Sequence, residues 1–172
     1  MVLEPLSGKV PQPKLRANIE QRDREFAPYL TIVQKGAAVG FPNRDKLKHH
    51  VYSFSPAKTF EIKLYAGQPA QPVTFDKTGE VALGCNIHDW MEAYVLVVDS
   101  PWFGKTGADG VIRIAGVPAG RYRLHIWHPR QTTAAAAQDV VVGANPAPRA
   151  DLVLDVAPRE PRHKPPADSG SY

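Results

Sequence analysis

Residues 80–99, EVALGCNIHDWMEAYVLVVD, consist of two apolar segments joined by a short loop. Both segments are rich in β-branched and aromatic residues, which is typical of strands. The loop carries the only cysteine of the chain, Cys85, followed by His88 and Met91 at intervals of three. A thiolate, an imidazole and a thioether are each ligands of soft metals, so this loop is a candidate metal site as well as a connection between two strands.

The same strand-like texture continues on both sides of this loop. Short segments of similar composition are separated by Gly, Pro, Asn or Asp, and no long window shows a helical period. A turn-rich connection follows Asp99, and the Ala-rich segment 132–138 has room for one helical turn. Strands are therefore expected at residues 29–33, 37–41, 50–54, 59–65, 80–85, 93–99, 121–127, 138–142 and 149–154. This pattern predicts an all-β sandwich with an additional C-terminal β-module.

Composition limits the other possibilities. The chain has 172 residues, of which 43% are hydrophobic and 22% charged, and its 17 prolines and 13 glycines favour strands and turns. A single cysteine excludes an internal disulfide. A net charge of +4 without interleaved basic and aromatic runs argues against nucleic-acid binding, and no apolar run approaches the ~20 residues of a membrane span. No nucleophile triad, carboxylate pair or phosphate-binding glycine loop indicates an enzyme.

The spacing in GCNIHDWM predicts that three ligands converge. Cys85 ends an apolar strand, and a tight turn can return His88 and then Met91 to the same point. Two histidines, one cysteine and a weak axial methionine form the electron-transfer site of blue copper proteins, so a second histidine is required. His49 and His50 both lie just before a strand, and strand alternation sends them to opposite faces, so only one of them should face the metal.

Residues 25–99 resemble the cupredoxin family, of the plastocyanin and amicyanin type. The similarity lies in the run QKGAAVGFPNRD (34–45), in the FDKTG turn (75–79) and in the Cys-x-x-His-x-x-Met spacing, which is similar to that of amicyanin. The resemblance implies one copper ion held by His49, Cys85, His88 and Met91. His49 is preferred because the His-x-Val phrase aligns there, and His50 is the alternative.

Three positions depart from the family pattern. His50 replaces the asparagine that usually follows the first ligand and braces the cysteine loop. Ile87 replaces a proline, and its free N–H could bond to the sulfur and stabilise the thiolate. Trp90 is bulky and lies between two of the implied ligands, where it either shields the metal or forms a docking surface.

The C-terminal part resembles a transthyretin-like or carboxypeptidase-regulatory-like β-module, mainly through DGVIRIAGVPAGRYRLHIWHP. Bacterial proteins that join the two elements look similar and often carry a methylamine-utilisation label, from which no substrate is inferred. We expect a flexible leader over residues 1–14, the cupredoxin domain over 15–99, the β-module packed on it over 100–156 and a disordered Pro-rich tail over 157–172.

The resemblance implies a type 1 (blue) copper protein that carries single electrons and is not an enzyme. The expected partner is a cytochrome or a redox enzyme, met through a transient contact. The start MVLEPLSGKV has no signal-peptide pattern, which a mature exported domain would share, so we expect a periplasmic protein. The alternatives are a copper chaperone or store, and a metal-free cupredoxin-like interaction module.

Overall fold

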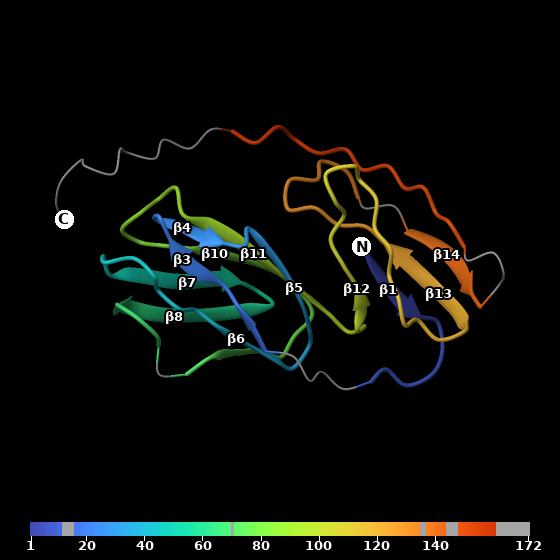
Figure 1. Cartoon of the computed structure of the whole chain (residues 1–172), viewed down its shortest axis with the longest axis horizontal. Coiled ribbons are helices and arrows are strands. Elements are labelled where there is room, and N and C mark those ends of the chain that lie inside the picture. Colours follow the sequence, from blue (N-terminus) through green and yellow to red (C-terminus); the bar gives the residue numbers. More distant parts are fainter. Residues whose placement is uncertain (12–15, 70, 135–136, 144–147, 161–172) are drawn as a thin grey trace.

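The computed structural model describes residues 1–11, 16–69, 71–134, 137–143 and 148–160. Within these residues the chain is all-β, as predicted, and none of them lies in an α-helix. Fourteen strands form four sheets, which group into a sandwich and a separate four-stranded sheet (Figure 1). The described part of the chain has no helix long and apolar enough to cross a membrane.

The largest sheet carries the candidate metal loop. Its strands, in spatial order, are β5 (Leu30–Gln34), β11 (Glu92–Val98), β10 (Gly79–Gly84), β7 (His49–Ser55) and β8 (Lys58–Tyr65). β5 and β11 are parallel, and the other neighbours are antiparallel. Because β10 and β11 form an antiparallel pair, the loop between them lies at one end of the sheet, beside the beginning of β7.

A second, three-stranded sheet closes the sandwich. It contains β2 (Arg16–Asn18), β6 (Ala37–Gly40) and β9 (Val73–Phe75). The two sheets share one buried core, because alternate residues of each strand point inward. The buried members of this core are Ile19, Phe26, Val33, Ala37, Val39, Phe41, Val51, Ala57, Phe75, Val81, Leu83, Cys85, Met91, Ala93, Val95 and Val97. Cys85 and Met91 therefore belong to the hydrophobic core of the sandwich.

A short hairpin lies beside the sandwich. It is formed by β3 (Glu20–Arg22) and β4 (Glu25–Ala27), which pair antiparallel. Its two-residue tip consists of Asp23 and Arg24, with φ angles of 55° and 56°. Two left-handed residues in succession are the backbone of a tight hairpin turn whose twist matches that of the strands.

The remaining sheet joins both ends of the described chain. Its order is β12 (Trp102–Phe103), β1 (Val2–Pro5), β13 (Gly120–His125) and β14 (Ala137–Val142), all antiparallel. The expectation of a flexible leader over 1–14 is therefore wrong for residues 2–5, because β1 lies between β12 and β13 and buries Val2 and Leu3. Residues 12–14 of that leader lie outside the described residues.

The other sequence-based expectations have mixed outcomes. Eight of the nine predicted strands are present, with shifts of one or two residues at their ends. Residues 149–154 form no strand, so that prediction is wrong. The possible helical turn over 132–138 is wrong for residues 137–138, because these begin β14. Residues 135–136 of that segment lie outside the described residues. Most of the predicted disordered tail, residues 161–172, lies outside the described residues, and the division into domains stays a prediction.

Candidate metal centre

The loop between β10 and β11 turns back on itself as its spacing predicts. The amide of Met91 donates to the carbonyl of His88 over 3.0 Å, which closes a tight turn. Nδ1 of His88 then lies 3.8 Å from Sγ of Cys85. Because Cys85 directly follows the last residue of β10, its sulfur is anchored by the sheet.

His49 supplies a third donor from the neighbouring strand. It is the first residue of β7, it is fully buried, and its Nδ1 lies 3.1 Å from Nδ1 of His88. One donor atom from each of His49, Cys85 and His88 falls within 4.8 Å of the others. In the described part of the chain, this is the only cluster of three or more His, Cys, Asp or Glu side chains that could hold a metal ion.

His50 points away from this cluster. Its Nε2 lies 2.9 Å from a carboxylate oxygen of Glu61 on the adjacent strand β8, and a bulge separates His49 from Val51 in that pairing. The backbone amide of His50 is nevertheless close to the sulfur of Cys85, to which it donates a hydrogen bond. The structure therefore turns the side chain of His49 toward the cluster and that of His50 toward Glu61 on β8.

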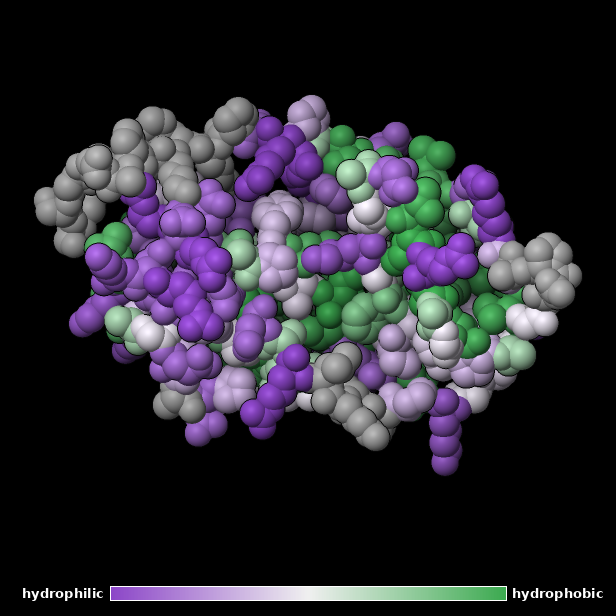
Figure 2. Space-filling view, in the orientation of Figure 1, coloured by the Kyte–Doolittle hydropathy of each residue, from purple (hydrophilic) through white to green (hydrophobic). Residues whose placement is uncertain are grey.

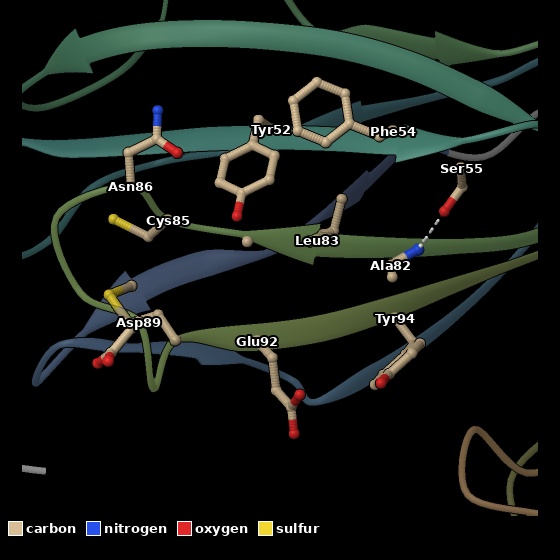
Figure 3. A pocket seen from close by; sticks show the side chains of 12 residues that line it. Tyr52, Phe54, Ser55, Ala82, Leu83, Cys85, Asn86, Asp89, Glu92 and Tyr94 are labelled. Atoms are coloured by element: carbon tan, nitrogen blue, oxygen red, sulfur yellow. Dashed lines mark hydrogen bonds between the residues drawn. The ribbon is translucent and has the colours of Figure 1, made fainter. Parts of the chain in front are cut away.

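Met91 lies in the same buried core cluster as Cys85, and only 2% of its surface is exposed. Both residues line an open cavity of about 590 Å³ on the face of the sheet that carries Tyr52 and Tyr94. Figure 3 shows Tyr52 near Cys85 within this cavity. Met91 is thus placed beside the cluster, and its role as an axial ligand stays a prediction.

The surroundings of Cys85 favour its thiolate form. Burial alone raises the pKa of this thiol, but the side chain of His49 and the amides of His50, Ile87 and His88 donate hydrogen bonds to the sulfur. These donors outweigh burial, and the net pKa of Cys85 is lowered. The amide of Ile87, which a proline at this position would lack, is one of the groups that lower this pKa.

The two histidines differ in their electrostatic environment. Burial lowers the pKa of His49, but hydrogen bonds and charge from Cys85 and Asp45 raise it by more, so the net pKa of His49 is raised. Burial lowers the pKa of the half-buried His88, and the positive charges of His49 and Arg24 lower it further. Without a metal, these surroundings shift Cys85 toward its thiolate form, His49 toward its protonated form and His88 toward its neutral form.

Asp45 was not singled out as a site residue by the sequence. One of its carboxylate oxygens lies 2.7 Å from Nε2 of His49. A carboxylate can only accept here, so Nε2 carries a hydrogen and Nδ1 is left to face the cluster. The one signal in the sequence is that Asp45 precedes His49 by four residues. This spacing alone does not specify a contact.

Trp90 packs against the side of the cluster. The centre of its ring lies 5.0 Å from that of His88, and its indole N–H donates to the carbonyl of Arg24 over 2.9 Å. The guanidinium of Arg24 lies over the same indole, 5.8 Å from its centre. Trp90 is therefore fixed between the ligand loop and the β3–β4 hairpin and covers one side of His88.

No protein-family model matches the sequence, and no curated protein matches it. Among solved structures, the chain is similar to a copper-containing nitrite reductase from Thermus scotoductus SA-01, with 21% identity and a TM-score of 0.46. That alignment covers 55% of this chain and 25% of the reductase chain, so this chain spans only about a quarter of the reductase.

Two smaller proteins are similar over much of their own length. A purple cupredoxin from Nitrosopumilus maritimus has 19% identity and a TM-score of 0.43, over 48% of this chain and 99% of its own. A reduced Cu(I) form of an amicyanin variant has 19% identity and a TM-score of 0.44, over 48% of this chain and 81% of its own.

Proposed function

We propose that this chain is a type 1 copper protein that carries single electrons between redox partners. The observation that carries the proposal is the convergence of Nδ1 of His49, Nδ1 of His88 and Sγ of Cys85 within 4.8 Å. This set of one thiolate and two imidazoles is softer than the oxygen ligands that magnesium or calcium prefer, and it suits copper.

The donor atoms are arranged as a metal site requires. Two imidazole nitrogens 3.1 Å apart cannot both carry hydrogens that face each other, so at least one lone pair points into the cluster. The lowered pKa of Cys85 makes the anionic sulfur that a metal requires easier to form. His49, Cys85 and His88 would hold the ion, and Met91 would be a weaker fourth ligand that tunes its potential.

When bound, copper would supply a one-electron couple between Cu(I) and Cu(II). The protein's part is to keep the ligands in place and to exclude water. His49 and Cys85 are anchored on separate strands, and both are buried in a densely packed core. Little reorganisation on electron transfer follows from this rigidity. His88 is half-buried and so offers the electron its route to the surface.

The remaining parts of the proposal concern partners and location. The partner would be a cytochrome or a redox enzyme that binds through a small transient interface. The chain itself would perform no bond-making chemistry, bind no nucleic acid and have no membrane span. Periplasmic or otherwise exported localisation fits a thiolate copper site, and it belongs to this proposal.

Copper storage or delivery is the main alternative. Such a role favours exposed, exchangeable ligands, whereas the chain has only two methionines including Met1, and His49 and Met91 are at most 2% exposed. Burial of the ligands therefore favours retention of the metal over its exchange. A metal-free interaction module is the second alternative, and it does not account for the buried thiolate and imidazoles.

A titration of the purified protein with Cu(II) tests the proposal. We expect an intense visible absorption band from thiolate-to-copper charge transfer that saturates at one equivalent, together with a reversible one-electron couple. The control is Cys85→Ser, which replaces one buried sulfur by oxygen and should remove the band. A colourless wild-type protein, or a spectrum that Cys85→Ser leaves unchanged, would contradict the proposal.

A further inference from the structure

The tip of the β3–β4 hairpin lies between the two segments that carry the candidate histidines. The peptide groups of Asp23 and Arg24 are held from one side by Asp45, which also contacts His49. The carbonyl of Arg24 is held from the other side by Trp90, which packs on His88. A single residue, Arg24, is therefore bonded to both ligand segments.

On the first side, the carboxylate of Asp45 accepts three hydrogen bonds. The amide of Asp23 donates to Oδ1 over 2.7 Å, the amide of Arg24 donates to Oδ2 over 2.9 Å, and Nε2 of His49 donates to Oδ2 over 2.7 Å. Only 14% of the Asp45 side chain is exposed. A bond to a carboxylate is stronger than one between neutral groups, so it fixes the ring plane and the tautomer of His49.

On the second side, the indole of Trp90 spans the gap between the hairpin tip and the ligand loop. Its N–H donates to the carbonyl of Arg24, and its ring contacts both His88 and the guanidinium of Arg24. Trp90 is partly buried and packs on the core that includes Cys85. The indole thus restrains His88 by ring contact while it is bonded to the hairpin tip.

The conformation of the tip depends on these contacts. Asp23 and Arg24 both have positive φ angles, which non-glycine residues adopt rarely and which commonly recruit Asn or Gly in hairpins of this kind. The backbone amides of both tip residues donate hydrogen bonds to the carboxylate of Asp45. The tip is therefore held in an uncommon backbone conformation by the same side chain that orients His49.

We propose that the hairpin tip is a clamp that sets the positions of His49 and His88 relative to each other before any metal binds. Asp45 and Trp90 are its positioning residues, and Arg24 is the shared link between them. The inference rests on the proposed copper site for its purpose, but the coupling itself is a property of the metal-free chain. The clamp also gives Trp90 a role that is distinct from partner docking.

The test uses three single variants of the full chain. Asp45→Asn keeps the size of the side chain but replaces one carboxylate oxygen by an NH2 group. This group cannot accept a hydrogen bond from a hairpin amide or from Nε2 of His49. Trp90→Phe keeps an aromatic ring beside His88, but it removes the indole N–H and makes the ring smaller. Glu20→Gln is the matched control, because it removes one negative charge from the same hairpin, where Glu20 pairs with Arg22 and Arg44.

The first measurement is hydrogen exchange in the metal-free protein. The clamp predicts that each variant affects the segment that it does not touch: Trp90→Phe speeds exchange in residues 45–49, and Asp45→Asn speeds it in residues 86–90. Loss of one hydrogen bond corresponds to about a two- to tenfold change in opening. Glu20→Gln should leave both segments within about twofold of wild type. If each variant affects only its own segment, the clamp is wrong.

The second measurement is the reduction potential of the Cu(II)-loaded protein. Asp45→Asn should raise the potential more than Glu20→Gln does, because His49 loses an anionic acceptor and becomes a weaker electron donor. An equal shift in the two variants would overturn the role of Asp45 as a positioning residue. If the wild-type protein takes up no coloured copper, the proposed function fails, while hydrogen exchange still decides whether the clamp exists.

Discussion

The sandwich and the four-stranded sheet are built from the same kind of strand, but they differ in how much they bury. Among the described residues, sixteen buried side chains form the core of the sandwich, and only Leu3, Tyr122 and Leu124 form that of the four-stranded sheet. On the face that Figure 2 shows, apolar side chains reach the surface over the four-stranded sheet more than at the far end of the sandwich, where polar ones dominate. The chemistry-bearing residues all lie in the sandwich, where dense packing can hold them.

The two regions also differ in what their strand ends carry. In the sandwich, His49 begins one strand and Cys85 follows another, so the fold brings two proposed metal ligands to one end of the sheet. In the four-stranded sheet, His125 ends β13, and its Nε2 lies 3.1 Å from a carboxylate oxygen of Glu4 at the surface. Among the described residues, the second region therefore has no cluster like that of His49, Cys85 and His88.

Removal of one candidate histidine ligand should have the largest effect, because the sandwich would then lack one of the three side chains that form its candidate metal site. His49→Ala should abolish the visible absorption of the Cu(II)-loaded protein, since a buried ligand is lost and no other side chain replaces it. His50→Ala is the control and should keep the colour, because the amide that donates to Cys85 belongs to the backbone. Colour that persists in His49→Ala but not in His50→Ala would reverse the ligand assignment.

Truncation in the larger core should have the next largest effect. Phe75 is fully buried in the sandwich, where its ring lies 6.1 Å from that of Phe60. Phe75→Ala should lower the free energy of unfolding by about 3–5 kcal/mol, from lost burial and the remaining cavity. Urea unfolding measures this change. A loss below about 1 kcal/mol would mean that the core is less tightly packed than its burial indicates.

The same kind of change in the smaller core should cost less. Leu3 is 8% exposed and lies in β1 between β12 and β13. Leu3→Ala should lower the free energy of unfolding by about 2 kcal/mol, near the lower limit for buried leucine, because few buried neighbours surround it. If urea unfolding gives no difference from wild type, β1 contributes little to the sheet. That result would favour the expectation of a flexible leader at residues 2–5 over a stabilising strand.

The smallest effect is expected at the axial position. Met91→Leu keeps an apolar side chain of similar volume and removes the thioether, so stability should change by less than about 1.5 kcal/mol. The reduction potential should rise by on the order of 60 mV, because lost donation from sulfur disfavours the more positive oxidation state. Voltammetry measures the shift. An unchanged potential would mean that Met91 is a core residue only.

Much of this architecture follows from local sequence, and the exceptions have physical reasons. β-Branched and aromatic composition between turn residues predicted the strands at 50–54, 59–65 and 93–99, because such side chains pack well on a sheet. β1 was missed because four residues next to prolines carry little periodicity, and their pairing with β13 depends on residues more than a hundred positions away. The segment 149–154 has strand-like residues but no partner strand in the described chain, so composition alone was misleading there.

The candidate site divides in the same way. The spacing of Cys85, His88 and Met91 indicated a common loop, because a tight turn acts over a few residues. The choice between His49 and His50 needed tertiary structure, since alternation says only that they face opposite ways. Asp45 and Arg24 were not identified because their contacts join segments about twenty residues apart, through a hairpin whose left-handed tip has no glycine to mark it.

The most direct test of the central claim is X-ray absorption spectroscopy of the protein loaded with one equivalent of copper. The three converging side chains predict one sulfur donor and two imidazole nitrogen donors at short distance from the metal, and loss of that sulfur in Cys85→Ser. A spectrum with only nitrogen and oxygen donors, unchanged by Cys85→Ser, would contradict the account and would place any bound copper elsewhere on the chain.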